Sequence, residues 1–505
     1  MTLSGMHILG IALTLVLIAL VGAYSGKKVK NAADFETGGG KAGSLIVAGT
    51  IIGTLVGGQA TVGTAQLAFS FGFSAWWFTL GSGLGCLALA LGYSRRMRHS
   101  GRVTLIGIIE QEYGKTTGYI GSVLSALGSF FSLLSNMLAL SALLTAILPV
   151  NMLTALIIAV ILASAYVIFG GVWGAGMGGI LKLLLLCFAC AVGAVLVLYL
   201  SSGQIMQPLG QLLDGTSMGT VAGLDSGETA RAHFLSLVSR GVKKDLGSGL
   251  SLILGVLSTQ TYAQAVWSAK SNRSARRGAL ISAFMIPPIG VACILIGLYM
   301  RAHYITSAEI AALAQLGQSV PEGMREIASS SQVFPAFVLN HMPKLLGGTV
   351  LGTLLITIVG GGAGLALGIA TILSGDIIKK LSHRFDSEKK SLAMLRVLIV
   401  IILSAAAAGA WMVPGAVIND YGFLSMALRA AVVFVPFTCA LFMRGRIVKK
   451  CAAVSIIAGP LTVIAGNLLN IPFDPLIAGI LVCIAVMAAG AVAAKRQTAP
   501  ITKED

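Results

Sequence analysis

The sequence predicts an all-α polytopic membrane protein with about 13 transmembrane helices, arranged as a 5+5 inverted repeat with broken helices. Of the 505 residues, 56% are hydrophobic, 63 more are glycine and only 10% are charged. The mean hydropathy is +0.90. Soluble proteins contain roughly 45–50% apolar residues with glycine included, so a soluble core cannot absorb this composition. Disordered and collagen-like classes are excluded by the same counts.

Thirteen apolar segments are long enough to span a bilayer. A hydrocarbon core of roughly 30 Å requires about 20 consecutive apolar residues in a helix. The predicted spans are 5–24, 44–70, 74–94, 117–147, 151–169, 178–200, 246–268, 277–300, 345–374, 392–412, 421–443, 451–470 and 474–493.

The basic residues predict the orientation of these spans. With the N-terminus outside and the C-terminus inside, 25 of the 35 Lys and Arg residues lie in inward loops or in the C-terminal tail, and seven lie in outward loops. This is the distribution that the positive-inside rule describes, and it predicts a multi-pass protein of the cytoplasmic (inner) membrane. Loop topology therefore explains the net charge of +17 without a nucleic-acid partner.

The sequence carries no signature of an enzyme, a metal site or a cofactor site. The six histidines are scattered, the seven cysteines lie in or beside apolar segments, and no loop exceeds 50 residues. We expect no cofactor and no metal, because neither ligand clusters nor a soluble catalytic domain can be recognised.

Two predicted spans contain glycine beside dense polar runs, which is typical of helices that unwind at mid-membrane. Glycine is costly in a helix and permits unusual backbone angles, and polar runs in lipid require a cavity. Close helix packing is the alternative explanation for such glycines. The second span contains Gly53, Gly57, Gly58 and Gly63 around Gln59, Thr61, Thr64 and Gln66, and the seventh contains Gly255 followed by Ser258, Thr259, Gln260, Thr261, Tyr262 and Gln264.

The separation of five spans between the two segments favours two inverted repeats, as in many transporters. We expect residues 44–200 (spans 2–6) and 246–443 (spans 7–11) to form the repeats, joined by an extracellular loop over 201–245. Residues 1–43 then form a peripheral first span with a cytoplasmic loop, and 444–505 form two peripheral spans with a cytoplasmic tail.

Four local motifs, in order along nearly the whole chain, resemble those of the sodium/solute symporters with the LeuT-like fold (the APC superfamily). Gly63-Thr64-Ala65-Gln66 with Phe69-Ser70-Phe71-Gly72 resembles the family's "G-T-P-G-E-A-Y-x-Y-G". Thr104 to Gly114 resembles "T-L-x-E-F-L-E-x-R-Y-G", Ser268 to Gly278 resembles "A-A-K-x-x-x-x-A-R-R-G", and Ser374 to Lys379 resembles "S-x-D-I-Y-K". The resemblance implies a secondary transporter and not an enzyme.

The chain departs from this family at the sodium site. The resemblance places the family's backbone ligands near Gly53 and Val56 in the second span and at Thr357 in the ninth. The two hydroxyl ligands of the ninth span fall on Gly360 and Gly361, which carry no side-chain oxygen.

The sixth span shows the same departure. The family's Thr-Asp pair falls on Gly178 and Gly179, and Lys182 follows one helical turn later. This pattern suggests that the ammonium group of Lys182 replaces sodium. Because burial disfavours a charged amine, such a lysine can exchange a proton, which predicts proton-coupled or sodium-independent transport. A lysine near a helix end can instead extend to the membrane surface.

Candidate substrate contacts are the polar side chains of the two broken spans together with an intramembrane arginine: Gln59, Thr61, Thr64, Gln66, Gln260, Gln264 and Arg429. Phe69 and Tyr262 are candidate gating residues. A charge at the depth of Arg429 requires a cavity or a partner, such as a substrate carboxylate, backbone carbonyls or Asp420. The positive interior favours a small organic solute that is anionic or zwitterionic.

Two alternatives remain open at this point. Sodium could bind at a shifted site built from Thr357, Thr371 and backbone carbonyls, which would make the protein an ordinary sodium symporter. The chain could also be a sensor that retains a transporter fold. The partners expected in every transport case are a small-molecule substrate, the bilayer and a coupling ion, either a proton or sodium.

Overall fold

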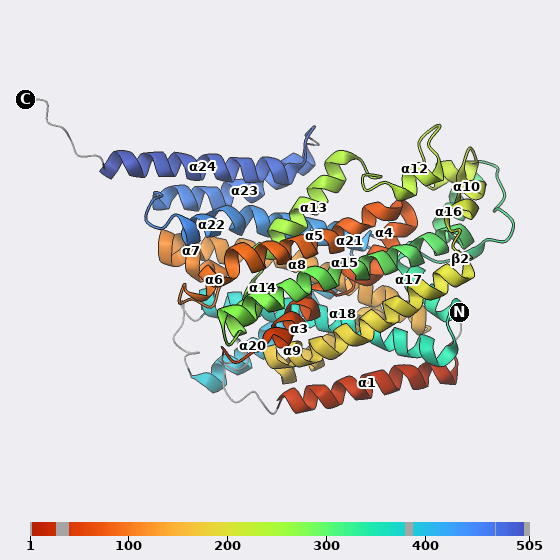
Figure 1. Cartoon of the computed structure of the whole chain (residues 1–505), viewed down its shortest axis with the longest axis horizontal. Helices are drawn as coiled ribbons and strands as arrows, with labels where there is room; N and C mark the ends of the chain where they lie inside the picture. The colour runs from red at the N-terminus through yellow and green to blue at the C-terminus, as the bar shows by residue number, and fades with distance from the viewer. Residues whose placement is uncertain (1–2, 27–39, 379–386, 470, 499–505) are drawn as a thin grey trace, which may run out of the picture.

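The computed structural model describes residues 3–26, 40–378, 387–469 and 471–498, which form an elongated bundle of helices (Figure 1). Nine helices in this part of the chain are long and apolar enough to cross a membrane, and three shorter apolar helices accompany them. The all-α membrane architecture predicted from composition is therefore confirmed. The count of thirteen spans stays a prediction. Several basic residues used to predict the orientation fall in 27–39 and 379–386, outside the described residues.

The first half of the chain contains one peripheral helix and the predicted first repeat. Its elements are α1 (Gly5–Gly26), α3 (Ser44–Leu55), η2 (Gln59–Gly63), α4 (Thr64–Phe71), η3 (Gly72–Trp76), α5 (Trp77–Ala88), η4 (Leu89–Tyr93), α6 (Ser94–Arg98), α7 (Leu105–Tyr113), α8 (Lys115–Ile147) and α9 (Met152–Leu200).

The second half begins with short helices that connect the repeats. It contains α10 (Met206–Leu213), α11 (Ser217–Val221), α12 (Ala230–Leu235), α13 (Val242–Leu257), α14 (Gln260–Ser268), α15 (Asn272–His303), β1 (Tyr304–Thr306), α16 (Ser307–Gln315), β2 (Arg325–Ile327), η5 (Ser330–Gln332), α17 (Val333–His341), α18 (Lys344–Ile372), η6 (Leu373–Ile378), α20 (Glu388–Trp411), α21 (Ile418–Arg429), η8 (Ala430–Phe434), α22 (Val435–Phe442), α23 (Lys449–Leu468) and α24 (Pro475–Thr498).

The helical segment α9 extends from Met152 to Leu200, but it is not one straight helix. Tyr166 Oη and Lys182 Nζ both lie close to Gly360, at 3.4 Å and 3.6 Å from the position that a Cβ would take there. Sixteen residues of straight helix would separate the two side chains by about 24 Å. The two halves of α9 therefore lie beside the same point of α18, as expected for the predicted fifth and sixth spans.

Two helices are broken where the sequence predicts unwinding. Helix α3 ends at Leu55, and the chain continues through Val56, Gly57 and Gly58 before η2 begins. The glycines are required here, because a Cβ on Gly58 would lie 2.3 Å from the Cβ of Ala139 in α8. Helix α13 ends at Leu257, and α14 begins at Gln260 after a break at Ser258 and Thr259.

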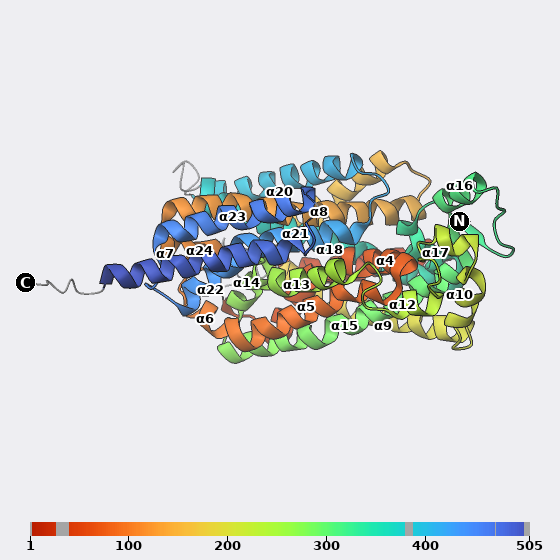
Figure 2. The ribbon, with the colours of Figure 1, turned by 90° about the horizontal axis from the view of Figure 1, so that it is seen from above.

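The two ends of the bundle differ in character. The short helices α10, α12 and α16 gather at one end, with a parallel strand pair that joins Tyr304 to Arg325 (Figures 1 and 2). Helix α1 packs against α18 and α9, whereas α23 and α24 pack against each other at the opposite side. Helix α1 begins near the end with the short helices and α24 finishes at the other end, as an odd number of crossings requires.

Candidate substrate and ion site

Lys182 lies where α9, α3 and α18 meet. Its side chain is buried, at 2% exposure, and its Nζ donates to the carbonyl oxygens of Gly53 at 2.5 Å and Thr357 at 2.8 Å. Gly53 is in the last turn of α3, where carbonyls lack donors from their own helix. The lysine therefore does not extend to the membrane surface. Its ammonium group contacts two of the three backbone carbonyls that the family resemblance assigns to sodium.

Three glycines, Gly179, Gly360 and Gly361, lie around Lys182 and offer no side-chain oxygen to a cation. A Cβ on Gly360 would be in van der Waals contact with Tyr166 and Lys182, at 3.4–3.6 Å, whereas a Cβ on Gly361 would lie 3.0 Å from the Cα of Gly57. Gly179 is more constrained, because a Cβ there would lie 2.0 Å from the carbonyl oxygen of Gly49. An aspartate cannot be accommodated at position 179 with this packing of α9 on α3.

Thr357, whose carbonyl accepts from Lys182, also has a hydroxyl without a partner in the described part of the chain. That hydroxyl is buried. Val56, the other predicted backbone ligand, is fully buried at the end of α3. Thr371, which the alternative sodium site would use, donates its hydroxyl to Leu367 of its own helix at 2.8 Å.

Arg429 lies fully buried at the break between α13 and α14. Its Nη1 donates to the hydroxyl of Thr259 at 2.7 Å, and its Nη2 donates to the hydroxyls of Ser425 at 3.0 Å and Ser132 at 3.3 Å. Its Nε donates to the carbonyl of Ser425 at 3.2 Å. All of these partners are neutral, and no ion pair to Arg429 occurs among the described residues. The guanidinium charge is solvated by hydroxyls but not balanced.

A line of polar side chains leads from Arg429 along the interface of α21 with η2. Gln59 Nε2 donates to both the carbonyl and the hydroxyl of Ser132, at 3.1 Å and 3.2 Å, and Ser132 also accepts from Arg429. Asn419 follows beside Gly63, where a Cβ would lie 2.2 Å from Asn419 Oδ1. Both polar atoms of the Asn419 amide are buried and have no hydrogen-bond partner among the described residues.

Asn419 was missed by reasoning from the sequence, because it lies in a predicted loop before the eleventh span. A buried amide with no partner is costly, so its position indicates a site that a ligand or water completes. A polar residue at the start of a span offers no signal in composition or spacing. Only its packing against the broken second span sets it apart.

Several of the predicted substrate contacts are committed to the protein itself. The hydroxyls of Thr61 and Thr64 donate to Gly57 and Gln59, at 3.0 Å and 3.1 Å, within the broken segment. Gln66 accepts from the backbone N–H of Ile418 at 3.0 Å and donates to Ser330 at 3.3 Å. Gln66 therefore joins α4 to the start of α21 and to η5.

The predicted residues of α14 are divided in the same way. Gln260 accepts from the N–H of Leu105 at 3.0 Å and donates to the carbonyl of Val103 at 2.9 Å, so its amide holds the loop before α7. Gln264 is buried one turn further along α14. Of the two candidate gating residues, Tyr262 neighbours Arg429. Phe69 instead lies under the guanidinium of Arg301, with 4.8 Å between the ring centre and Cζ.

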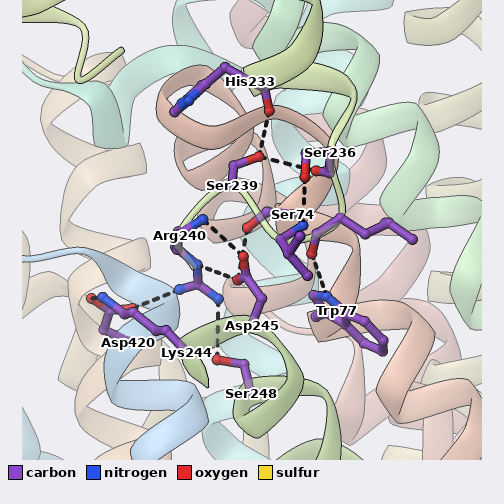
Figure 3. A network of polar contacts seen from close by, with 12 residues as sticks. Ser74, Trp77, His233, Ser236, Ser239, Arg240, Lys244, Asp245, Ser248 and Asp420 are labelled. Atoms are coloured by element: carbon purple, nitrogen blue, oxygen red, sulfur yellow. Dashed lines mark hydrogen bonds and ion pairs between the residues drawn. The ribbon is translucent and has the colours of Figure 1, made fainter. Parts of the chain in front are cut away.

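A network of ion pairs closes the end of the bundle that carries the short helices (Figure 3). Arg240 lies just before α13 and donates to Asp245 at 2.7 Å and to Asp420 of α21 at 3.2 Å. Asp245 also accepts from the hydroxyl of Ser74 at 2.9 Å, and Lys244 lies 3.5 Å from Asp420. The network thus joins α13, η3 and α21.

The opposite end is closed by backbone contacts between the two broken helices. The N–H of Ala42 donates to Ser268 at 2.8 Å, and the N–H of Lys270 donates to Ala42 at 2.9 Å. Trp267 donates to the carbonyl of Met97 at 3.0 Å. Lys182 and Arg429 therefore lie between two sets of closing contacts, each of which joins elements that are far apart in the sequence.

Comparison with known proteins places this arrangement in a family. The model of the sodium:solute symporter family matches residues 35–459. The chain belongs to this family. It is 24% identical over 459 residues to the "High affinity choline transporter 1" of Homo sapiens, covering 87% of this chain and 73% of that protein. It is 20% identical to an uncharacterized symporter of Bacillus subtilis, covering 74% and 70% of the two chains.

Solved structures establish the fold of this symporter-family chain. It superposes on a Na+-coupled sialic acid symporter with a TM-score of 0.73, at 17% identity and 98% coverage of both chains. A closed conformation of a nucleobase-cation-symport-1 family transporter gives a TM-score of 0.51 at 13% identity, covering 94% of this chain and 98% of the other. The predicted LeuT-like fold is confirmed. The protein is a multi-pass membrane transporter of the secondary active symporter class, and its relatives are transporters and not enzymes.

Proposed function

We propose that this symporter-family protein carries a small anionic or zwitterionic solute and that the ammonium group of Lys182 replaces the sodium ion. The observation that carries the proposal is the pair of hydrogen bonds from Lys182 Nζ to Gly53 at 2.5 Å and Thr357 at 2.8 Å. These bonds connect α9 to the broken helix α3 and to α18, which is the connection that a bound cation would otherwise make.

A sodium ion and the lysine would compete for the same two oxygens. The carbonyls of Gly53 and Thr357 can hold a cation between them, and Nζ already occupies that position. Loss of a proton from Lys182 would remove the charge that holds α3 to α18, and uptake of a proton would restore it. Proton-coupled transport follows if this change alternates with opening, and sodium-independent exchange or uncoupled transport follows if the lysine stays charged.

The charge around the second site supports an anionic or zwitterionic solute. Arg429 is fully buried with neutral partners, so a substrate carboxylate would supply the balancing charge. The named choline transporters act on a cation, which requires aromatic faces or carboxylates. Buried Arg429 and Lys182 would repel a cation, so we expect this chain to differ from them in substrate. Asn419, whose buried amide has no partner among the described residues, is the side chain best placed to orient the remainder of the solute.

The test requires one ligand and two separate gradients. Thermal-shift screening of small acids, amino acids and sugars against the purified protein identifies a stabilising ligand. Uptake of that ligand into proteoliposomes is then measured under a sodium gradient and, separately, under a proton gradient. We expect a proton gradient to drive uptake in the native protein and not in Lys182→Ala. Uptake that disappears when sodium is replaced by choline at fixed pH would overturn the proposal.

A sodium site shifted from the usual position is the second candidate. The buried hydroxyl of Thr357 favours it, because that oxygen has no partner among the described residues and belongs to the residue whose carbonyl already binds the Lys182 ammonium. The chain also belongs to the sodium:solute symporter family, which favours sodium as the coupling ion. In that case uptake would follow the sodium gradient and would survive the Lys182→Ala substitution, whereas Thr357→Val would abolish the dependence on sodium.

A further inference from the structure

A groove of about 650 Å³ lies outside the central site, between α8, α13, α21, α23 and α24. Its volume is in the range of sites for drug-sized molecules, roughly 300–1,000 Å³. Most of its wall is aliphatic or aromatic. Its apolar lining includes Leu127, Phe131, Val432, Ile464 and Leu468.

The groove opens on the side of the bundle, between α8 and α23. At this opening Leu127 is 50% exposed, Ile464 is 44% exposed and Leu468 is 81% exposed. Aliphatic side chains with such exposure on membrane-spanning helices face lipid. An occupant can therefore enter from the bilayer without passing through the central site.

The charged groups of the groove all lie at one end of it. Lys244 is the third residue of α13, Asp420 is the third residue of α21, and Asp474 immediately precedes α24. Val432 marks the other end, twelve residues along from Asp420 and thus about 18 Å deeper at helical rise. That depth is close to half of a hydrocarbon core of roughly 30 Å, so the groove matches one leaflet in length.

The polar end contains both signs of charge. The Lys244 side chain is 54% exposed and lies 3.5 Å from Asp420, which also accepts from Arg240 at 3.2 Å. Asp474 caps α24 through Oδ1, which accepts from the N–H groups of Leu476 at 2.9 Å and Ile477 at 3.3 Å. Its other oxygen, Oδ2, lies against Gly247, where any side chain would exclude it.

We propose that this groove binds a phospholipid whose headgroup carries a primary ammonium, such as phosphatidylethanolamine. One acyl chain lies along the apolar wall toward Val432. Lys244 binds the phosphate, and the ammonium donates hydrogen bonds to Asp474. A choline headgroup has no N–H to donate to Asp474, and a headgroup without an amine gives Asp474 no donor either. A zwitterion with a primary amine supplies both the phosphate for Lys244 and the donor for Asp474.

Binding at this groove also affects the network that closes the same end of the bundle. The phosphate competes with Asp420 for Lys244, which is the weaker of the two cations that hold Asp420 because it is more exposed and more distant. Removing the Asp420 charge therefore frees Lys244 and does not weaken lipid binding, whereas removing the Lys244 charge weakens it. The two neighbouring residues thus have opposite expected effects.

The experiment is native mass spectrometry of the delipidated full-length protein titrated with lipids of identical acyl chains. We expect phosphatidylethanolamine to bind at least fivefold more tightly than phosphatidylcholine or phosphatidylglycerol. Lys244→Gln and Asp474→Asn each lower the affinity at least fivefold, Leu127→Trp at the opening lowers it for all three lipids, and Asp420→Asn leaves it unchanged or raises it. Lys344→Gln, at an exposed lysine that begins α18 outside the groove, is the matched control and has no effect.

The proposal is overturned if all three lipids bind equally well to the native protein. It is also overturned if Lys244→Gln and Asp474→Asn bind phosphatidylethanolamine with the same affinity as Lys344→Gln. A melting curve of each variant in the same detergent shows that it is folded, which the exposure of Lys244 and Leu127 leads us to expect. The measurement involves no transport, so its outcome is independent of the proposed coupling mechanism.

Discussion

Replacing Lys182 by alanine should convert a site that excludes sodium into one that accepts it. The substitution removes the ammonium group from between the carbonyls of Gly53 and Thr357, at 2.5 Å and 2.8 Å. It leaves these two carbonyl oxygens without the donor that Lys182 supplied. Two oxygens from two helices are a partial shell for a hard cation, which prefers oxygen ligands.

The magnitude follows from the charge that is removed. A sodium ion displaced to about 4 Å from the ammonium would be repelled by about 4 kcal/mol at an effective dielectric constant of about 20. Since about 1.4 kcal/mol corresponds to a tenfold change in affinity, the native lysine weakens sodium binding about a thousandfold. In Lys182→Ala, sodium at ten times its dissociation constant would stabilise the folded protein by about 1.4 kcal/mol.

The assay is thermal unfolding of both proteins in detergent, titrated with sodium chloride and with potassium chloride at equal ionic strength. We expect the melting temperature of the native protein to be the same in both salts, and that of Lys182→Ala to rise only with sodium. Lys344→Ala, at an exposed lysine of α18, controls for loss of a positive charge. A native protein that sodium stabilises as much as the variant would refute the reasoning, because the lysine would then not occupy the ion site.

Three further predictions concern other parts of the molecule. Arg240→Gln leaves the fully buried Asp245 without its charged partner, which should lower the free energy of unfolding by about 3–5 kcal/mol. Asp420→Asn acts on a carboxylate that is 41% exposed and should lower it by at most about 1 kcal/mol. Chemical denaturation measures both losses, and equal losses would contradict this prediction. Burial, with Arg325 and His303 nearby, lowers the pKa of His341 to about 4 from 6.5. Between these two pH values the unfolded chain binds more protons than the folded protein, so the melting temperature should fall as the pH drops from 6.5 toward 4 and stay level above 7. His341→Gln should reduce that fall. If the melting temperature of the variant depends on pH as that of the native protein does, another group is responsible. Gly179→Asp should fail to fold, because its Cβ would lie 2.0 Å from a backbone oxygen, and recovery of normally folded Gly179→Asp by size-exclusion chromatography would show that α9 can shift.

Composition and the spacing of apolar segments are sufficient to predict the all-helical membrane architecture. A chain with 56% hydrophobic residues and 10% charged residues has to place most of its length in lipid, and in lipid the backbone has to satisfy its own hydrogen bonds as helices. The breaks after Leu55 and Leu257 were predictable because glycine beside polar side chains makes a helix costly at that place. The sequence also predicts the loss of the two hydroxyl ligands for sodium, because the family motif that ends the ninth span places these ligands at Gly360 and Gly361.

The tertiary structure decided which polar side chains remain available for a ligand, because hydrogen-bond partners come from distant segments. Gln59, Gln66 and Gln260 look equivalent in the sequence, but their amides bond to Ser132, Ile418 and Leu105 respectively. Asn419 gave no signal, and only its burial without a partner marks it. The reach of Lys182 to Gly53 and Thr357, 129 and 175 residues away, depends on how α9 folds back against α18. Local pattern determines where a helix forms and breaks, whereas the packing of whole helices determines what each side chain contacts.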